Sequence, residues 1–276
     1  MECENRLFVA YKPSFISSNA FLNQLKKKYK VKKGGFSGTL DPFAKGVLII
    51  AFGQYTKLFQ FLDKTPKTYK TVIWLGAKSE SLDIEKIEEI KNIPPFTLNK
   101  IEKVCKSLIG EVEYYPPKYS AKKINGKRAY KLARENMEFD IKKVTSKIYD
   151  IKILNYSHPF LSLEITVSQG GYIRSIGELI ASKLHVNGTL TYLERVREGK
   201  FVYENEKALN PTDYLNLKEN FYKGDIEDIV KGKKLKIENL KIDKNGEYFL
   251  KNRNLLSLIK IENGKVSYIL NGIKLC

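Results

Sequence analysis

Apolar positions near the start of the chain fall into short strand-like and helix-like patterns. RLFVAYKP (6–13) predicts a strand that ends at Pro13, and Ser17 or Ser18 can then cap a helix over 19–30. VLIIAFG (47–53) is a largely apolar run that predicts a buried strand. An amphipathic helix over 55–62 and a strand over 69–76 are expected next.

The middle of the chain continues this mixed pattern. After a polar, looser stretch over 77–96, Thr97 can cap a helix that stops at Gly110. FLSLEITV (160–167) alternates as a half-buried strand does, and a helix is expected over 174–184. Because strands and helices do not alternate as regular βαβ units, the pattern favours an α+β fold with a mixed sheet.

The pattern changes around 204–215. The lysine-rich remainder contains strand-like pieces such as EYFLKN, LSLIKIENG and KVSYILNG, in which NG and ENG predict hairpin turns. We therefore predict a first domain over 1–205 and a small β-rich domain over 206–276.

The net charge of the chain bears on the class of its binding partner. The 276 residues carry a net charge of +18, which favours a polyanion through neutralisation of its phosphates. A lysine-rich genome explains the same excess, so composition leaves both interpretations open.

Other bulk features indicate the compartment and argue against a metal. Three scattered cysteines without a C-x-x-C pair suit a reducing cytosol. No signal peptide is evident, and no apolar stretch approaches the roughly 20 residues of a membrane span. His158 and His185 lie far apart without further ligands at metal spacing. We expect a soluble cytoplasmic protein without a metal site.

GGFSGTLDPFAKG (34–46) is the segment richest in candidate chemistry. Its glycines allow close backbone approach, and Asp41-Pro42 restricts the backbone around an acid. Such an acid can be a pre-positioned nucleophile, or it can bond its own backbone in an Asx-turn. A phosphate-binding P-loop does not fit, because no G-K-[ST] follows the glycines.

Several motifs, taken together, carry a family resemblance. GFSGTLDPFAKGVL (35–48) resembles the active-site motif of the TruB family of bacterial tRNA pseudouridine-55 synthases. Further matches follow in the order of the family: KPSFISS (12–18), KTYKTVIWLG (67–76), PPKYSAKKINGKRAY (116–130) and GGYIR (170–174). The resemblance covers about residues 6–200.

This resemblance implies a pseudouridine synthase fold, with a largely antiparallel central sheet flanked by helices, and a reaction without a cofactor. The enzyme would flip uridine 55 out of the T loop of a tRNA and isomerise it to pseudouridine. Asp41 would be the nucleophile, with its point of attack left open. Arg174 would pair with Asp41, although a surface arginine fits the same pattern. Tyr69 would pack on the base, although a core tyrosine is the simpler interpretation.

Departures from the family pattern mark further candidates. Phe36 replaces the usual histidine, and its ring could stack or wedge against RNA instead. Phe15 and Gly171 replace a glycine and a threonine, while Asp83 keeps an acid in a region that is otherwise changed. By the same resemblance, Leu193 aligns with a family position that lines the pocket, and Tyr172 is a further candidate for contact with the substrate. Leu193 read alone is simply core.

A basic segment is the candidate RNA grip. Residues 118–134 carry seven Lys or Arg and no Asp or Glu, with tyrosines interleaved. In the family this region belongs to an insertion, here about 112–145, that holds the T stem-loop. The candidate contacts are Lys122, Lys123, Lys127 and Arg128, and a solvated basic helix is the alternative. The C-terminal piece weakly resembles the family's small RNA-binding (PUA-like) domain.

The expected partner is the T stem-loop of tRNA, with no membrane, no obligatory protein partner and a monomer as the default state. Two other hypotheses stay open. One is a tRNA-folding chaperone activity, which basic surface and loop recognition would also serve. The other is a guide-directed relative, a class that needs protein partners.

Overall fold

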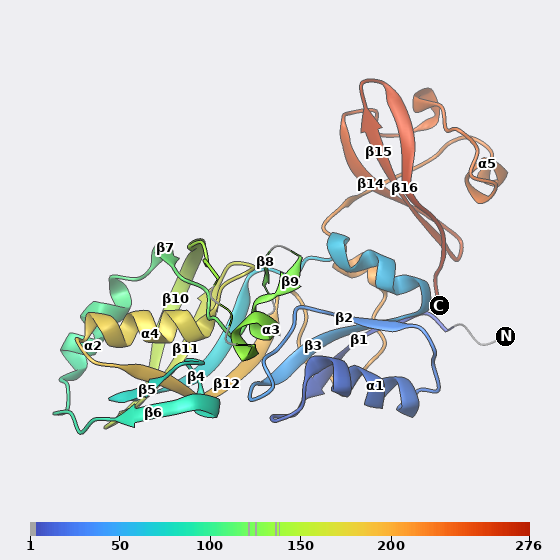
Figure 1. Cartoon of the computed structure of the whole chain (residues 1–276). Coiled ribbons are helices and arrows are strands. Elements are labelled where there is room, and N and C mark those ends of the chain that lie inside the picture. Colours follow the sequence, from blue (N-terminus) through green and yellow to red (C-terminus); the bar gives the residue numbers. More distant parts are fainter. Residues whose placement is uncertain (1–3, 121, 125, 136, 138) are drawn as a thin grey trace.

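The computed structural model describes residues 4–120, 122–124, 126–135, 137 and 139–276 (Figure 1). In this part of the chain the central sheet has eight strands, in the order β1-β3-β12-β4-β11-β10-β7, with β2 paired to β3. Their bounds are β1 Arg6–Lys12, β2 Gly34–Ser37, β3 Lys45–Phe52, β4 Lys67–Leu75, β7 Gly110–Tyr114, β10 Val144–Ser157, β11 Phe160–Val167 and β12 Gly188–Glu198. Among these strands, β12 and β3 run parallel and the other pairs are antiparallel. The predicted α+β fold with a mixed, largely antiparallel sheet is confirmed.

One half of the sheet is covered on both faces. Helix α1 (Ser18–Lys28) is capped by Ser17, whose hydroxyl accepts from the backbone N–H of Ala20, and packs on one face of β1 and β3. The opposite face packs against η1 (Gly53–Phe61). Strand β3 is buried from both sides, which explains its uninterrupted apolar run.

The other half of the sheet packs against α4 (Ile173–Lys183) and α2 (Leu98–Lys106). Thr97 caps α2 as predicted, but the helix ends at Lys106. Gly110 instead opens β7 with a φ of +116°, a conformation that a glycine adopts readily. The predicted helix over 55–62 forms as the 3₁₀-helix η1.

Short elements fill the polar stretch over 77–96, which was predicted to be looser, and the basic segment. Within 77–96, a hairpin of β5 (Ala77–Ser79) and β6 (Ile87–Ile90) encloses η2 (Ile84–Lys86). The basic segment forms a hairpin of β8 (Lys123–Ile124) and β9 (Lys127–Arg128), followed by α3 (Ala129–Arg134).

The C-terminal part builds a separate sheet, as predicted (Figure 1). Its described strands are β13 (Lys218–Asn220), β14 (Gly246–Asn252), β15 (Leu255–Glu262) and β16 (Lys265–Lys274), accompanied by η3 (Pro211–Tyr214), α5 (Ile226–Val230) and η4 (Ile237–Asn239). Leu256, Leu258 and Ile273 from this sheet share a hydrophobic cluster with η1 and β1, so the two sheets are joined by apolar packing.

Two details qualify the predicted C-terminal organisation. Asn263 and Gly264 form the two-residue hairpin turn between β15 and β16, both at positive φ. Asn271-Gly272 is not a turn, because it lies inside β16 at a register shift against β15. The bridge Leu7–Leu209 keeps the chain beside β1, and the bridge Leu62–Leu215 keeps it beside the end of η1. The boundary at 205 therefore stays a prediction.

Candidate active site

The Asp41 loop, residues 38–44, connects β2 to β3 and is tied down by its backbone. The backbone N–H of Leu40 donates to Ser18 Oγ at 3.0 Å, and the Ser18 hydroxyl donates back to the Leu40 carbonyl at 3.0 Å. The N–H of Ala44 closes a turn on the carbonyl of Asp41 at 3.1 Å. In the described part of the chain, no backbone N–H donates to the Asp41 carboxylate. The carboxylate is therefore free of the Asx-turn that the sequence also allowed.

A buried lysine supports the loop from β1. The side chain of Lys12 is fully buried, and its Nζ donates to the carbonyl oxygens of Pro13 at 2.8 Å, Ile16 at 2.7 Å and Pro42 at 3.3 Å. The backbone N–H of Phe15, the residue in place of the family glycine, also donates to Pro42. Phe15 adopts a φ of +65° there, a conformation that favours glycine. These contacts fix the residue that follows Asp41.

Arg174 connects the Asp41 loop to the hairpin of β5 and β6. Its Nε lies 2.9 Å from Asp41 Oδ2, and its Nη1 lies 3.1 Å from Asp83 Oδ2. Nη1 also donates to the carbonyl of Ser81, and Nη2 donates to the carbonyl of Tyr119, each at 2.8 Å. The guanidinium is almost fully buried, so its orientation is set from several directions.

The position of Arg174 in α4 is electrostatically unfavourable by itself. It lies in the first turn of the helix, where the macrodipole disfavours a cation. Two carboxylates compensate for this. Asp83 accepts from Ser81 Oγ at 2.6 Å and from the backbone N–H of Glu85 at 3.1 Å. Burial raises the pKa of Asp83, and the positive charge of Arg174 opposes the rise.

Tyrosines and a leucine from neighbouring elements form the wall opposite the loop. Tyr69 from β4 is buried, and burial raises the pKa of its hydroxyl above the usual 10.0. Tyr172 precedes α4, and its backbone N–H donates to the Tyr114 hydroxyl at 3.0 Å. Leu193 from β12 is buried beside them. At neutral pH the Tyr69 hydroxyl is protonated, so it is a poor proton acceptor.

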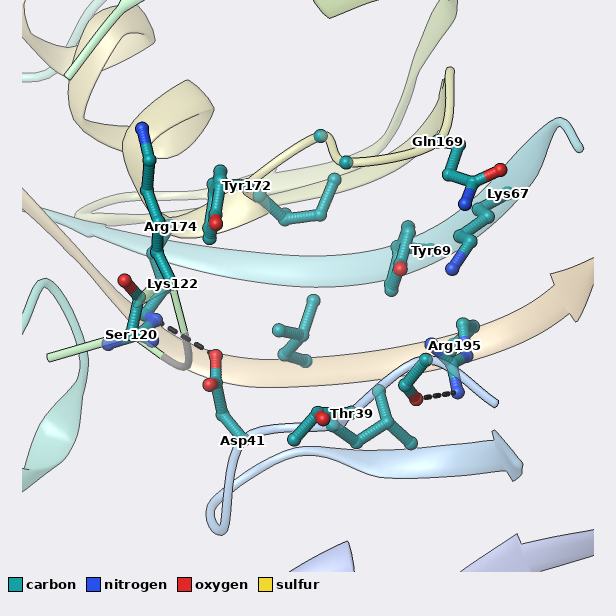
Figure 2. A pocket seen from close by; sticks show the side chains of 16 residues that line it. Thr39, Asp41, Lys67, Tyr69, Ser120, Lys122, Gln169, Tyr172, Arg174 and Arg195 are labelled. Atoms are coloured by element: carbon teal, nitrogen blue, oxygen red, sulfur yellow. Dashed lines mark hydrogen bonds and ion pairs between the residues drawn. The ribbon is translucent and has the colours of Figure 1, made fainter. Parts of the chain in front are cut away.

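These groups surround a cavity of about 340 Å³ (Figure 2). Asp41 and Arg174 lie toward one side, and Lys67 and Gln169 lie toward the other, with Tyr69 between them (Figure 2). The lining residues are Gly38, Thr39, Leu40, Asp41, Lys67, Tyr69, Ser120, Lys122, Gln169, Gly170, Gly171, Tyr172, Ile173, Arg174, Leu193 and Arg195. An acid of partial exposure, 31% for its side chain, thus faces a space of the size of a small-molecule site.

Most of the residues singled out from the sequence meet in this cavity. Asp41, Tyr69, Tyr172, Arg174, Leu193 and Lys122 all line it. Phe36 lies outside it: the side chain is half-buried on β2 and packs against the cluster under α1. Lys127 is exposed on β9. The side chains of Lys123 and Arg128 lie outside the described part of the structure.

Other polar residues of the site were not singled out from the sequence. Lys67 and Arg195 line the cavity, and Glu198 is buried next to them. Strand alternation in β4 places Lys67 on the same face as Tyr69, a signal that was available. Among the described residues, no group of three or more His, Cys, Asp or Glu is placed to hold a metal ion. None of the described helices has the length and apolar character needed to cross a bilayer.

Comparisons with known proteins agree with this site. Residues 26–173 match the family model described as TruB family pseudouridylate synthase (N terminal domain). The chain is 56% identical over 269 residues to the tRNA pseudouridine synthase B of a Nitratiruptor species, covering 98% of each chain. It is 54% identical over 272 residues to the protein of that name from Campylobacter jejuni subsp. jejuni serotype O:6, covering 99% of this chain and 100% of the relative.

Solved structures share the fold. A chain of a Cbf5-Nop10-Gar1 complex superposes with a TM-score of 0.68 at 20% identity, over 98% of this chain and 84% of that one. A chain of the archaeal box H/ACA sRNP Nop10-Cbf5 complex gives 0.66 at 19% identity, over 98% and 86%. At such identity the likeness shows the fold alone.

The site and the matches define an isomerase of the pseudouridine synthase class. Within that class, the chain belongs to the TruB family of pseudouridylate synthases.

Proposed function

We propose that this enzyme converts uridine 55 in the T loop of tRNA to pseudouridine, with the base flipped into the cavity and Asp41 as the nucleophile. The names of the relatives, tRNA pseudouridine synthase B, support a tRNA substrate. The T loop and uridine 55 are what the sequence motifs imply. The observation that carries the role of Asp41 is its ion pair with Arg174. A partly exposed carboxylate is held at 2.9 Å from a buried guanidinium, at the edge of a cavity that can take a base.

The chemistry needs a fixed carboxylate and room for a base. The N1–C1′ bond of the uridine breaks, the detached base rotates, and C5 bonds to C1′ while the C5 proton is lost and N1 regains one. A stacked base is out of reach, so it must leave the loop and enter the cavity. The Tyr69 ring offers a stacking surface, and its raised pKa makes stacking a better role than proton abstraction at neutral pH.

RNA would approach along the basic segment. Lys122 lines the cavity and Lys127 is exposed on the adjacent hairpin. Phosphate neutralisation by such residues strengthens binding without reading the base sequence. The net charge of +18 supports the same partner.

We further propose that the enzyme acts as a monomer in the cytoplasm without an obligatory protein partner. A structural neighbour comes from a Cbf5-Nop10-Gar1 complex, and those partners belong to that protein. Turnover of a T stem-loop transcript by the purified protein alone tests whether a protein partner is needed. A requirement for added cell extract would contradict it.

The decisive experiment compares wild type, Asp41→Asn and the surface control Asp150→Asn, which lies on β10 with an exposed side chain. We expect Asp41→Asn to lose turnover while RNA binding survives, and Asp150→Asn to behave as wild type. Full turnover by Asp41→Asn would refute the nucleophile. Pseudouridine mapped at another position, or an unchanged T loop in tRNA from a deletion strain, would refute the substrate.

The same variants address the chaperone alternative. Assistance to tRNA folding is measured with wild type and Asp41→Asn, in parallel with pseudouridine formation. Equal assistance without turnover would reveal a second activity that does not need the carboxylate.

A further inference from the structure

Three buried charged side chains lie directly behind the Asp41 loop. Lys67 Nζ lies 3.0 Å from Glu198 Oε1, and Arg195 Nη2 lies 3.2 Å from Glu198 Oε2. Arg195 and Glu198 are at most 1% exposed, and Lys67 is 9% exposed. We call these three residues the charge triad.

Strand register builds the charge triad. In the antiparallel pair of β12 and β4, Glu198 is the partner of Lys67, and Arg195 is the partner of Tyr69. Directly opposite side chains lie close together on one face of a sheet. The triad is therefore part of the same wall as Tyr69.

The guanidinium of Arg195 joins the start of the Asp41 loop to the strand that follows the loop. Its Nη2 donates to the carbonyl of Gly38 at 2.9 Å, at the start of the loop, and its Nε donates to the carbonyl of Val47 at 2.8 Å, within β3. Arg195 is also the register partner of Gly46 in the parallel pair of β12 and β3. A Cβ on Gly46 would lie 2.3 Å from the Arg195 carbonyl oxygen, so this approach requires glycine.

Gly38 brings the loop into contact with all three charges. Its φ is +69°, which favours glycine. A Cβ at this position would lie 3.0 Å from Glu198 Oε1, 3.0 Å from Lys67 Nζ and 3.1 Å from Arg195 Nη1. The start of the Asp41 loop thus rests on the charge triad without an intervening side chain.

Burying these charges is costly in free energy. Replacing buried ion pairs by packed apolar residues is often neutral or stabilising, so stability alone does not account for the triad. What an apolar group cannot do is donate to two carbonyls at once in a fixed geometry, as a guanidinium does. We therefore interpret the charge triad as a device that fixes the position of the loop backbone rather than one that stabilises the fold.

We propose that Arg195 is a positioning residue for the reaction, which sets the place of Asp41 by joining Gly38 to Val47, and that Glu198 and Lys67 hold its guanidinium in that orientation. The proposal rests on the proposed role of Asp41 as nucleophile. Arg174 contacts the carboxylate itself, whereas Arg195 acts on the backbone that carries it.

The test is Arg195→Lys, which keeps a cation beside Glu198 but cannot donate to both carbonyls in the same geometry. Single-turnover rate at saturating T stem-loop RNA, RNA affinity and the thermal unfolding midpoint are measured together. We expect the rate to fall by about 100-fold, as misplacement of a reacting group by about 1 Å can cause, with RNA affinity largely unchanged. Wild-type rate would overturn the proposal.

A control separates positioning from loss of stability. Leu161→Ala removes buried core packing on β11, at the end of the strand remote from Lys67. It should lower the unfolding midpoint and keep the wild-type rate. If its rate falls as far as that of Arg195→Lys, the positioning role is refuted.

A double-mutant cycle adds a second readout. Gly38→Ala pushes a methyl group into the triad and displaces the same loop, so its effect on the rate should not add to that of Arg195→Lys. Additive losses would show independent roles and contradict the proposal. Asp41→Asn in the same assay keeps the two proposals distinct: if it stays active the nucleophile is wrong, whereas an inactive Asp41→Asn beside a fully active Arg195→Lys refutes only the positioning role.

Discussion

Asp41 and Asp83 share one guanidinium: Arg174 reaches the first through Nε at 2.9 Å and the second through Nη1 at 3.1 Å. The two carboxylates differ in exposure, with 31% of the Asp41 side chain and 4% of the Asp83 side chain accessible. The accessible acid can meet a substrate, while the buried acid can only hold the arginine. This asymmetry assigns them different roles within one site.

The first prediction concerns the shape of the guanidinium. Arg174→Lys keeps the charge but cannot contact Asp41, Asp83 and two carbonyls together. We expect the single-turnover rate to fall by about 100-fold. Arg197→Lys on exposed β12 surface is the matched control and should keep the wild-type rate. Equal rates for both variants would contradict a role for the arginine geometry.

The second prediction concerns Asp83. Asp83→Asn leaves Arg174 with one carboxylate in place of two, and breaking a buried ion pair costs about 3 kcal/mol at the lower end of measured values. We expect the free energy of unfolding in urea to fall by that amount. Asp150→Asn, with its exposed ion pair at 3.8 Å, should change it by less than about 1 kcal/mol. An unchanged stability of Asp83→Asn would show that Asp41 alone balances the arginine.

The third prediction concerns pH. Burial lowers the pKa of Lys12 from 10.5 to about 8, and the nearby Asp41 carboxylate opposes the shift. Between pH 8 and 10.5 the unfolded chain therefore binds more protons at this residue than the folded chain, so the contribution of Lys12 to stability rises with pH.

Lys12→Met isolates this effect. The unfolding free energy of wild type minus that of Lys12→Met should rise from pH 8 toward pH 10, with a slope of at most about 1.4 kcal/mol per pH unit. Chemical denaturation across this range measures it. A difference that stays flat with pH would mean that Lys12 titrates at its ordinary value when folded.

The fourth prediction concerns the basic segment. Replacing Lys122 and Lys127 by Gln should weaken RNA binding and make the plot of log affinity against log salt shallower by about 1 to 2 units, as two phosphate contacts are lost. The rate at saturating RNA should stay closer to wild type than the affinity does. Lys106→Gln, on the exposed face of α2, is the control. An unchanged salt slope in the double variant would exclude these lysines as phosphate contacts.

Local chemistry accounts for the elements that were predicted well. The cap at Ser17, the cap at Thr97 and the alternation over 160–167 each involve neighbours within a few positions in the sequence. The end of α2 and the place of Asn271-Gly272 were missed, because β7 and β16 recruit these residues into sheets. Long-range pairing overrode local turn preference at both places.

For the candidate site, the sequence by itself determined the chemistry on offer: an acid in a glycine-rich loop, a tyrosine in a strand, an arginine at a helix start. Their order along the chain indicated the family. Local sequence could not choose between an Asx-turn and a nucleophile for Asp41, because both use the same residues.

The tertiary structure decided between these two alternatives, because in the described part of the chain no backbone N–H donates to the Asp41 carboxylate. It brought Arg174 from a distant helix to Asp41, and it packed Phe36 away from the cavity. It also placed Arg195 behind the loop, through the register of β12 against β3 and β4. These relationships depend on which strands pair and in what register, and pairing is settled by burial of the whole sheet rather than by neighbours in the chain.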